Sequence, residues 1–252
     1  MKIHFLGTCS GTEPMLGRNH TSWCLETGDK LYFFDAGEGC SRSAHLMGLD
    51  ALSIKAIFIS HPHIDHIGGL SNLVWLVEKL RVRTKQLPKH GGYDLFLPAM
   101  SIWEGVKGIL TYSGGLGDKY AVNTHPIEDG VIFDDGCIKV TAYRNKHMKN
   151  YDGSFSYLVE HEGKRIVYSG DVKSYDEMDA AIGEHCDALI CETGHHLIDD
   201  TYEYLKNKNI DRIFYNHHGR EILNATDECR ERISNLFGGK AVISDDGLTV
   251  EI

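Results

Sequence analysis

The chain has 252 residues, of which 42% are hydrophobic and 25% are charged, an ordinary composition for a globular protein. Its formal net charge of −10 argues against a broad electrostatic contact with nucleic acid, because such binding depends on cationic side chains that neutralise phosphates. The negative charge does not exclude phosphate chemistry in a pocket where metal ions supply the positive charge.

No export or membrane segment is evident. The opening stretch MKIHFLGTCSG has only a short apolar run before Gly7, far too little for the core of a signal peptide, and no window approaches the roughly 18 apolar residues of a membrane helix. The seven cysteines are scattered and include no CxxC pair, so we expect reduced thiols. We therefore expect a cytoplasmic protein that does not contact membranes.

Short β-rich runs alternate with helical patterns along the first part of the chain. Three runs predict a meander of strands, a helical stretch follows, and a buried strand then leads into a cluster of histidines. From Leu70 the apolar residues recur with a helical period. The expected elements are strands at 2–7, 22–27, 30–37, 54–60, 93–98 and 138–144, and helices at 40–49, 70–83 and 100–110.

After Ser154 a similar order of elements follows. Two strands precede helices and single strands in turn, and the chain closes on a hairpin that turns at Asp246-Gly247. The expected elements are strands at 155–161, 164–171, 187–193 and 212–217, helices from Tyr175, at 199–209 and at 226–237, and the hairpin at 240–252. In both halves a meander of strands is followed by alternating helices and strands, although the amino-acid sequences of the two halves show no convincing similarity to each other. We expect one domain over residues 1–252, of the α/β class, with two mixed sheets and helices outside them.

The most informative stretch is ISHPHIDHIGG, residues 59–69, which places three histidines and an aspartate within six positions where a hydrophobic strand ends. His61 and His63 are two residues apart, so in an extended segment they project to the same side and can share one metal ion. Asp65 and His66 follow at the turn into a helix and would point to a second position. Imidazole with carboxylate suits zinc, and also iron or manganese.

Other strand ends offer further ligands for a binuclear site. The run VTAYRNKHMKN continues past a strand to His147, IVYSGDV ends a strand at Asp171, and RIFYNHHG ends one at His217 and His218. The carboxylate of Asp171 could bridge two ions. A single histidine after a strand is more often a surface residue, so each of these alone is weak evidence. Their combination with the histidine cluster predicts a centre for two metal ions.

This series of motifs (HxHxDH, a later His, SGD and a strand-ending His) resembles the metallo-β-lactamase superfamily over essentially the whole chain. The resemblance implies a four-layer αββα sandwich of two mixed β-sheets flanked by helices. It also implies two divalent metal ions, zinc foremost, with manganese or iron as alternatives. In the pattern of the superfamily, one ion is bound by His61, His63 and His147, the other by Asp65, His66 and His217, and Asp171 bridges them. His217 fits this pattern better than His218 because it directly follows the strand.

The flanking segments FLGTCSGTEP, GRNHTS and FFDAGEG resemble the ribonuclease Z-like branch, whose members hydrolyse phosphodiesters. In its tRNA-processing enzymes, a histidine in a Gly-His-Ser/Thr turn assists catalysis. The segment ETGHHLID offers Gly194-His195 in the corresponding place, but His196 stands where Ser or Thr is usual. The choice between His195 and His196 is therefore open, and a helix-entry turn with a solvated histidine pair is the alternative interpretation.

A second departure concerns the tRNA-binding arm, which processing enzymes insert between the third His and the bridging Asp. Here that interval is 171 − 147 = 24 residues and is predicted to hold a strand pair. We therefore expect a catalytic core without the arm, acting on a small or short phosphodiester such as a cyclic nucleotide, a nucleotide diester or a short RNA. The alternatives are a lactonase or other ester hydrolase of the same fold, and a non-catalytic metal-binding sensor.

Metal chemistry suggests roles for the candidate residues. Two cations lower the pKa of a bridging water towards neutrality. Asp65 would orient the resulting hydroxide and take up its proton, and His195 or His196 would protonate the leaving oxygen. Ser10 and Thr12, in the first glycine-rich turn, are weaker candidates for substrate contact. The expected partner is a small-molecule substrate; extensive nucleic-acid binding is disfavoured by the charge, and a homodimer is left open.

Overall fold

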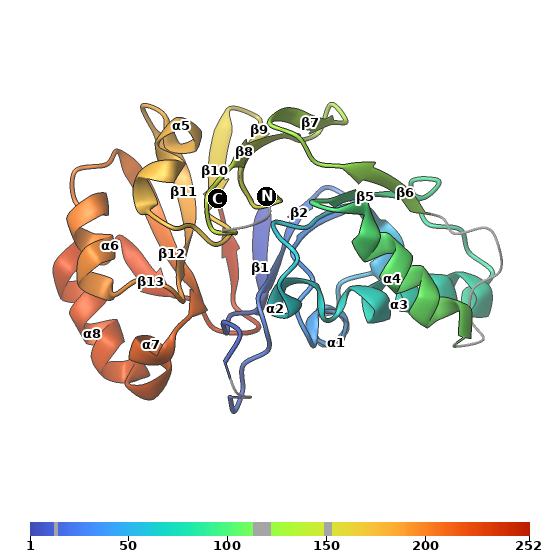
Figure 1. The fold of residues 1–252 in the computed structure, drawn as a ribbon, viewed down its shortest axis with the longest axis horizontal. Helices are drawn as coiled ribbons and strands as arrows, with labels where there is room; N and C mark the ends of the chain where they lie inside the picture. Colours follow the sequence, from blue (N-terminus) through green and yellow to red (C-terminus); the bar gives the residue numbers. More distant parts are fainter. Residues whose placement is uncertain (13–14, 113–121, 149–152) are drawn as a thin grey trace.

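Two β-sheets face each other in the computed structural model, which describes residues 1–12, 15–112, 122–148 and 153–252 (Figure 1). Within these residues each sheet has seven strands, in the orders β14-β1-β2-β3-β4-β5-β6 and β13-β12-β11-β10-β9-β8-β7. The strands of the first sheet are β1 Lys2–Gly7, β2 Ser22–Thr27, β3 Lys30–Phe34, β4 Ile54–Phe58, β5 Tyr93–Leu97, β6 Val122–Pro126 and β14 Thr249–Glu251. Those of the second are β7 Gly130–Asp134, β8 Lys139–Arg144, β9 Phe155–His161, β10 Lys164–Tyr168, β11 Cys186–Thr193, β12 Ile210–His218 and β13 Ala241–Ile243.

The two sheets share one pattern of pairing. In the first sheet, the neighbours from β14 to β3 pair antiparallel and those from β3 to β6 pair in parallel. In the second sheet, the neighbours from β7 to β10 pair antiparallel and those from β10 to β13 pair in parallel. The two halves of the fold therefore have the same arrangement, in agreement with the order of elements expected for each half, although their amino-acid sequences do not repeat.

Helices cover the outer face of each sheet, so the molecule has four layers (Figure 1). Buried residues of α1, α3 and α4 pack on the first sheet, and those of α5 to α8 pack on the second. The helices are α1 Cys40–Leu46, α2 Ile64–Ile67, α3 Leu70–Thr84, α4 Met100–Tyr112, α5 Asp179–Ile182, α6 Ile198–Leu205, α7 Arg220–Asn224 and α8 Thr226–Phe237, with 3₁₀ turns at Ala51–Ser53 and Tyr175–Met178. The predicted αββα sandwich is confirmed.

The layers follow from the alternation of side chains along the strands, because successive residues of a strand face opposite sides of a sheet. In β3, Leu31 and Phe33 pack towards the helices, whereas Tyr32 and Phe34 belong to the core between the two sheets. Both faces are buried, so such strands are nearly continuous apolar runs. This is why the central strands were recognisable in the sequence.

The final hairpin predicted at 240–252 is wrong. β13 pairs in parallel with β12 in the second sheet, whereas β14 pairs antiparallel with β1 in the first sheet. Arg18 holds the loop between them, donating to the Ser244 carbonyl at 3.0 Å and to Asp245 Oδ1 at 2.8 Å. The Gly247 N–H then donates to the Phe5 carbonyl at 2.8 Å. The loop therefore carries the chain from one sheet to the other.

Smaller differences concern edge elements. The sequence patterns missed β6 and β7, whose residues are half-buried or exposed and form no apolar run. The helix predicted from Tyr175 is a 3₁₀ turn followed by the short α5. Across the ranges that the structure describes, no helix has the length and apolar character needed to cross a membrane. The seven cysteines are free thiols, as predicted.

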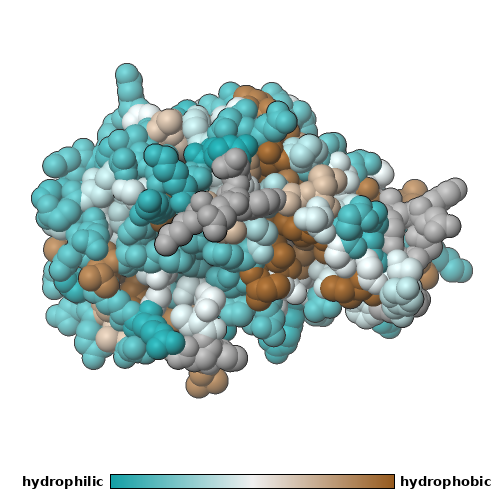
Figure 2. All heavy atoms as spheres, viewed as in Figure 1, coloured by the Kyte–Doolittle hydropathy of each residue, from teal (hydrophilic) through white to brown (hydrophobic). Residues whose placement is uncertain are grey.

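The surface differs between the two halves of the molecule. In the view of Figure 1, the half that carries α6 to α8 is largely hydrophilic, whereas apolar patches gather on the other half (Figure 2). The exposed large apolar side chains of α3 and α4 are Trp75, Val82, Met100, Ile109 and Tyr112. Trp75 and Ile109 also line a hollow with Ser71 and Asn72. The helix layer of the first sheet is therefore the more apolar of the two.

Candidate metal centre

The seven side chains named by the motifs lie together where strands of both sheets end. The segment after β4 carries four of them into α2, and the other three follow β8, follow β10 and lie near the end of β12. They form two groups, His61, His63, His147 and Asp171, and Asp65, His66 and His217. Within each group the ligand atoms lie within 4.8 Å of one another.

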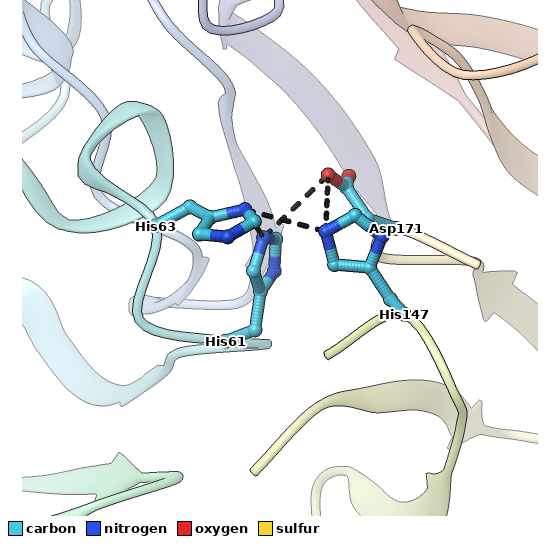
Figure 3. A group of neighbouring side chains, drawn as sticks. All are labelled: His61, His63, His147 and Asp171. Atoms are coloured by element: carbon cyan, nitrogen blue, oxygen red, sulfur yellow. Dashed lines mark hydrogen bonds and ion pairs between the residues drawn. The ribbon is translucent and has the colours of Figure 1, made fainter. Parts of the chain in front are cut away.

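In the first group, three imidazoles converge near one carboxylate (Figure 3). His61 Nε2 is 3.5 Å and His147 Nε2 is 3.6 Å from Asp171 Oδ2. His63 Nδ1 lies 3.0 Å from His61 Nε2 and 3.2 Å from His147 Nε2. The ligand atoms of a tetrahedral zinc ion with bonds of about 2.0–2.1 Å are about 3.3 Å apart, so these separations fit one ion held among the four side chains.

The second group shares Asp171 with the first. His217 Nε2 is 3.1 Å from Asp65 Oδ2 and 3.4 Å from Asp171 Oδ2. His66 Nε2 is 3.5 Å from Asp65 Oδ2 and 3.4 Å from Asp171 Oδ1. Asp171 is therefore within reach of both groups, as a bridging ligand would be.

The surroundings of Asp171 fit a bound cation. Its side chain is 1% exposed, yet among the described residues its Oδ1 has no hydrogen-bond partner, and neither has the Nε2 of the adjacent His66. Burial disfavours the charged carboxyl, but the neighbouring His217, His66 and His61 hold the pKa of Asp171 well below its usual range. A buried carboxylate oxygen without a hydrogen bond needs a compensating positive charge, and divalent ions among imidazoles would supply it.

Asp35 supports the centre and was not identified from the sequence. It is fully buried and accepts hydrogen bonds from Ser60 N at 2.6 Å, Ser60 Oγ at 2.8 Å, His66 Nδ1 at 2.7 Å and Tyr168 Oη at 2.6 Å. A carboxylate on Nδ1 fixes the ring so that Nε2 of His66 faces the other donors. The segment FFDAGEG contains Asp35, but no spacing rule relates it to a histidine 31 residues later.

A β-bulge directs His217 to the centre. The register of β11 and β12 shifts so that one residue of β12 is left over between the pairs Glu192–Asn216 and Thr193–His218. His217 is this extra residue and has a φ of 49°; a bulge of this kind turns a side chain in a new direction. His218 is buried, bonds a backbone carbonyl after β13 at 2.8 Å, and has its pKa lowered to about 3 by burial. The structure thus brings His217, and not His218, into the cluster.

The two candidate acids face different surroundings. His195 Nδ1 lies 2.7 Å from Glu192 Oε2 and 3.7 Å from Asp171 Oδ2, and its side chain is 42% exposed. The hydrogen bond to Glu192 raises the pKa of His195 above its ordinary value. His196 Nε2 donates to the Val172 carbonyl at 2.9 Å. His195 therefore faces the centre, and His196 is turned away into the protein.

Glu192 is a second residue that the motifs did not identify. Its side chain is 0% exposed and accepts the Val172 N–H at 2.6 Å as well as the bond from His195. Its Oε2 is also 3.5 Å from His217 Nδ1. One carboxylate thus contacts both the candidate acid and a candidate ligand. Its position near the end of β11, an acid within a buried strand, was the signal that could have revealed it.

Ser10 and Thr12 lie in the loop after β1. The Ser10 hydroxyl donates to a backbone carbonyl of β12 at 2.8 Å, and Thr12 Oγ1 lies 3.4 Å from Cys9 Sγ. Gly11 lies between them, and a Cβ added there would be 3.0 Å from the carboxyl of Asp65. The loop therefore lies beside the centre, while substrate contact by Ser10 or Thr12 stays a prediction.

A comparison with models of protein families shows the family to which this chain belongs. The model of the family described as "Anti-Pycsar protein Apyc1" matches residues 1–207. The chain belongs to this family.

Several proteins similar in sequence to this member of the Apyc1 family are named as ribonucleases. Ribonuclease Z of Methanothermobacter thermautotrophicus is 30% identical over 147 residues, which are 58% of this chain and 45% of that protein. Ribonuclease BN of Cronobacter sakazakii is 32% identical over 167 residues, 65% of this chain and 51% of that protein. The chain spans about half the length of these relatives.

Solved structures share the fold over their whole length. Human tRNase Z, short form, has a TM-score of 0.76 at 20% identity, covering 100% of this chain and 99% of that one. The metallo-β-lactamase fold protein YhfI from Bacillus subtilis has a TM-score of 0.77 at 17% identity, with coverage of 100% and 99%. Together with the relatives, they place the chain in the metallo-β-lactamase superfamily, on its ribonuclease Z-like branch, as predicted.

Proposed function

We propose that this protein is a binuclear metal-dependent phosphodiesterase that hydrolyses a small or short phosphodiester, such as a cyclic nucleotide, a nucleotide diester or a short RNA. The observation that carries the proposal is the convergence of seven donors in two groups that share Asp171. The names of the relatives, ribonuclease Z and ribonuclease BN, and of a structural neighbour, a diphosphatase of the PhnP family, support chemistry at phosphorus.

Two divalent ions fit the donor sets. His61, His63 and His147 would hold one, Asp65, His66 and His217 the other, and Asp171 both. Zinc suits the imidazole-rich sets best, with manganese or iron as alternatives. When bound, such ions supply a water that ionises near neutral pH and positive charge for the phosphate oxygens.

The chain's own residues would move the protons. Burial disfavours the charged form of Asp65, but the hydrogen bond from His217 and the charge of His66 lower its pKa below the usual range and keep it ionised. As a carboxylate beside the centre, Asp65 would orient the attacking water and take up its proton. His195 would donate a proton to the leaving oxygen. Glu192 would keep the imidazole of His195 oriented and favour its protonated form.

The size of the substrate is inferred from what lies between His147 and Asp171. The described part of this interval holds the β9–β10 strand pair, with register His161 to Lys164 across a tight turn. This supports a core without a tRNA-gripping arm. The net charge of −10 also supports a substrate with few phosphates.

The test compares His195→Ala with His196→Ala on two diesters, one with a good and one with a poor leaving group. Without its acid, the first variant should lose roughly 10²–10⁴-fold in kcat on the poor leaving group and much less on the good one, with the two ions of the main groups retained. His196→Ala should behave like the unmodified protein on both. Wild-type rates for both variants would refute the role of His195.

Lactones and precursor tRNA belong in the same assay with zinc- and manganese-loaded protein. We expect turnover of small diesters and poor cleavage of the tRNA. Efficient lactone opening without diester turnover would contradict the proposed activity, and site-specific trimming of a tRNA 3′ trailer would contradict the proposed substrate size. Metal binding without any turnover would point to a sensor.

A further inference from the structure

A third set of donors lies beside the two groups already described. It comprises Asp171, Glu192, His195 and His217, with ligand atoms within 4.8 Å of one another. Two of its members, Glu192 and His195, belong to neither of the other sets. Three members are buried, and His195 is 42% exposed, so the set is open to solvent through its histidine.

The contacts within this set centre on one oxygen of Glu192. Oε2 lies 2.7 Å from His195 Nδ1 and 3.5 Å from His217 Nδ1. The Nδ1 atom of His217 is buried and has no hydrogen-bond partner among the described residues. On the other side, Asp171 Oδ2 is 3.7 Å from His195 Nδ1. A nitrogen of His195 therefore faces two carboxylates, in a mixed imidazole and carboxylate environment that zinc prefers.

We infer that Glu192 and His195, with Asp171 beside them, form an accessory site for a divalent transition-metal ion. The ion would take the place of the proton that His195 Nδ1 now shares with Glu192 Oε2, and that proton would pass to solvent. The accessory ion therefore holds His195 as a ligand and prevents it from acting as the acid. Excess metal inhibits the enzyme; this last consequence rests on the proposed function, whereas the site itself does not.

The movement required is small. The nitrogen and oxygen must separate from 2.7 Å to about 3.3 Å to accept an ion with bonds of about 2.0–2.1 Å. Glu192 is anchored by the Val172 N–H at 2.6 Å, so His195, exposed on the turn between β11 and α6, would make the adjustment.

The accessory ion should bind more weakly than the other two. It has fewer donors of its own, because Asp171 and His217 are shared with the main groups. It also lies close to two positive ions, whose repulsion is strong in a partly buried site. The site should therefore fill last, when free metal is in excess.

The experiment counts bound zinc by equilibrium dialysis and elemental analysis over a range of free zinc concentrations. The unmodified protein should bind two ions tightly and a third at higher zinc. His195→Ala should keep the two and lose the third, with an affinity lowered about tenfold or more, whereas the matched control His196→Ala should bind three. His195→Gln, which retains a side chain of similar size, repeats the test, and circular dichroism checks that each variant is folded.

Two results would overturn the inference: a plateau at two ions in the unmodified protein, or a third ion that persists in both His195 variants. Where diesters are hydrolysed, inhibition by zinc should follow occupancy of the third ion and disappear in the His195 variants. Inhibition that is unchanged in them would contradict the proposed consequence. The ion count decides the accessory site even if no diester is turned over, so failure of the proposed function is distinguishable from failure of this inference.

Discussion

His217 occupies a backbone conformation that few side chains adopt, with a φ of 49°. This left-handed conformation costs on the order of 1–2 kcal/mol for a residue other than glycine. The ring is directed to the cluster, where Gly194 provides the space for it. A Cβ on Gly194 would lie 2.3 Å from His217 Nδ1, far closer than atoms can approach. The imidazole of His217 can therefore occupy this position only because residue 194 has no side chain.

Gly194→Ala should displace the ring of His217 and lower the affinity for one metal ion by about 10–100-fold, the effect typical of disturbed ligand orientation. Metal titration followed by isothermal calorimetry measures this. Gly108→Ala is the control, because a Cβ on Gly108 meets no atom of the described residues within 4 Å and alanine favours the helix α4 by about 0.5–1 kcal/mol. Equal metal affinity in both variants would show that His217 needs no such space.

Asp35 is the residue on which most buried hydrogen bonds at the centre converge. Asp35→Asn leaves an amide that cannot accept all four of its donors, so we expect about 3–5 kcal/mol lower free energy of unfolding and weaker zinc binding. Tyr168→Phe removes a single donor and should cost only about 1 kcal/mol. Urea unfolding with and without zinc measures both, and similar losses in the two variants would contradict the central role of Asp35.

The seven candidate ligands could be located from the sequence because each lies inside one motif or just past a strand. Asp35 and Glu192 were not identified, because their roles depend on contacts with His66 and His217, 31 and 25 residues further along the chain. His217 was preferred to His218 because it was expected to follow the strand directly, whereas β12 continues to His218 and a β-bulge directs His217 to the cluster. This bulge has no sequence signal that we recognise.

At the scale of elements, the turn between β7 and β8 of the second sheet is hydrogen-bonded to the first sheet. Asp135 in this turn accepts from Lys30 Nζ and from Tyr32 Oη, both at 2.8 Å, and both belong to β3 of the opposite sheet. It also accepts the N–H groups of Cys137 and Ile138 at 3.0 Å. Burial alone would raise the pKa of Asp135, but these hydrogen bonds lower it to about 2.

This shift predicts how the contact depends on pH. The folded pKa lies below the unfolded value of about 3.9, so the contribution is complete above about pH 4 and is lost as the pH falls towards 2. Asp135→Asn should therefore lower the free energy of unfolding by about 1.5–3 kcal/mol at pH 7, with a smaller difference at pH 3. Urea unfolding at several pH values, with the exposed Asp29→Asn as control, tests this. A difference that stays constant from pH 7 to pH 3 would show that the charge is not responsible.

Elements that pair with their neighbours in sequence were predictable, whereas the pairing of the segment 240–252 was not. The segment 240–252 has the alternation and the Asp-Gly turn of a hairpin, so local pattern favours one. The actual partners, β12 and β1, are chosen by packing and by side chains such as Arg18 more than 200 residues away. Local patterns do not contain that information.

At the scale of the whole molecule, the two halves contribute jointly to the centre. Asp65 and His66 come from the first half, and Asp171 and His217 come from the second. Metal ions held between them would therefore join the halves, and would also neutralise the charges gathered there. Stability should depend on the metal as well as on the cores.

Removal of metal with a chelator should lower the melting temperature. At free metal of about 100 times the Kd, one ion contributes about 2.7 kcal/mol, which for a domain of this size corresponds to roughly 5–10 °C. Differential scanning calorimetry with zinc, with chelator and after zinc is restored measures the change. His61→Ala should show a smaller difference between the two conditions. An identical melting temperature with zinc and with chelator would contradict a folded-state metal centre.

The pairing of β1 with β14 affects the order in which the protein can be completed during its synthesis. Lys2 faces Glu251 and His4 faces Thr249, so one edge of β1 stays unpaired until residues 249–251 have been synthesised. Exposed strand edges invite pairing with other chains. The nascent protein therefore carries an open edge until β14 has been made, and chains that stop before residue 249 should aggregate more readily than chains that include β14.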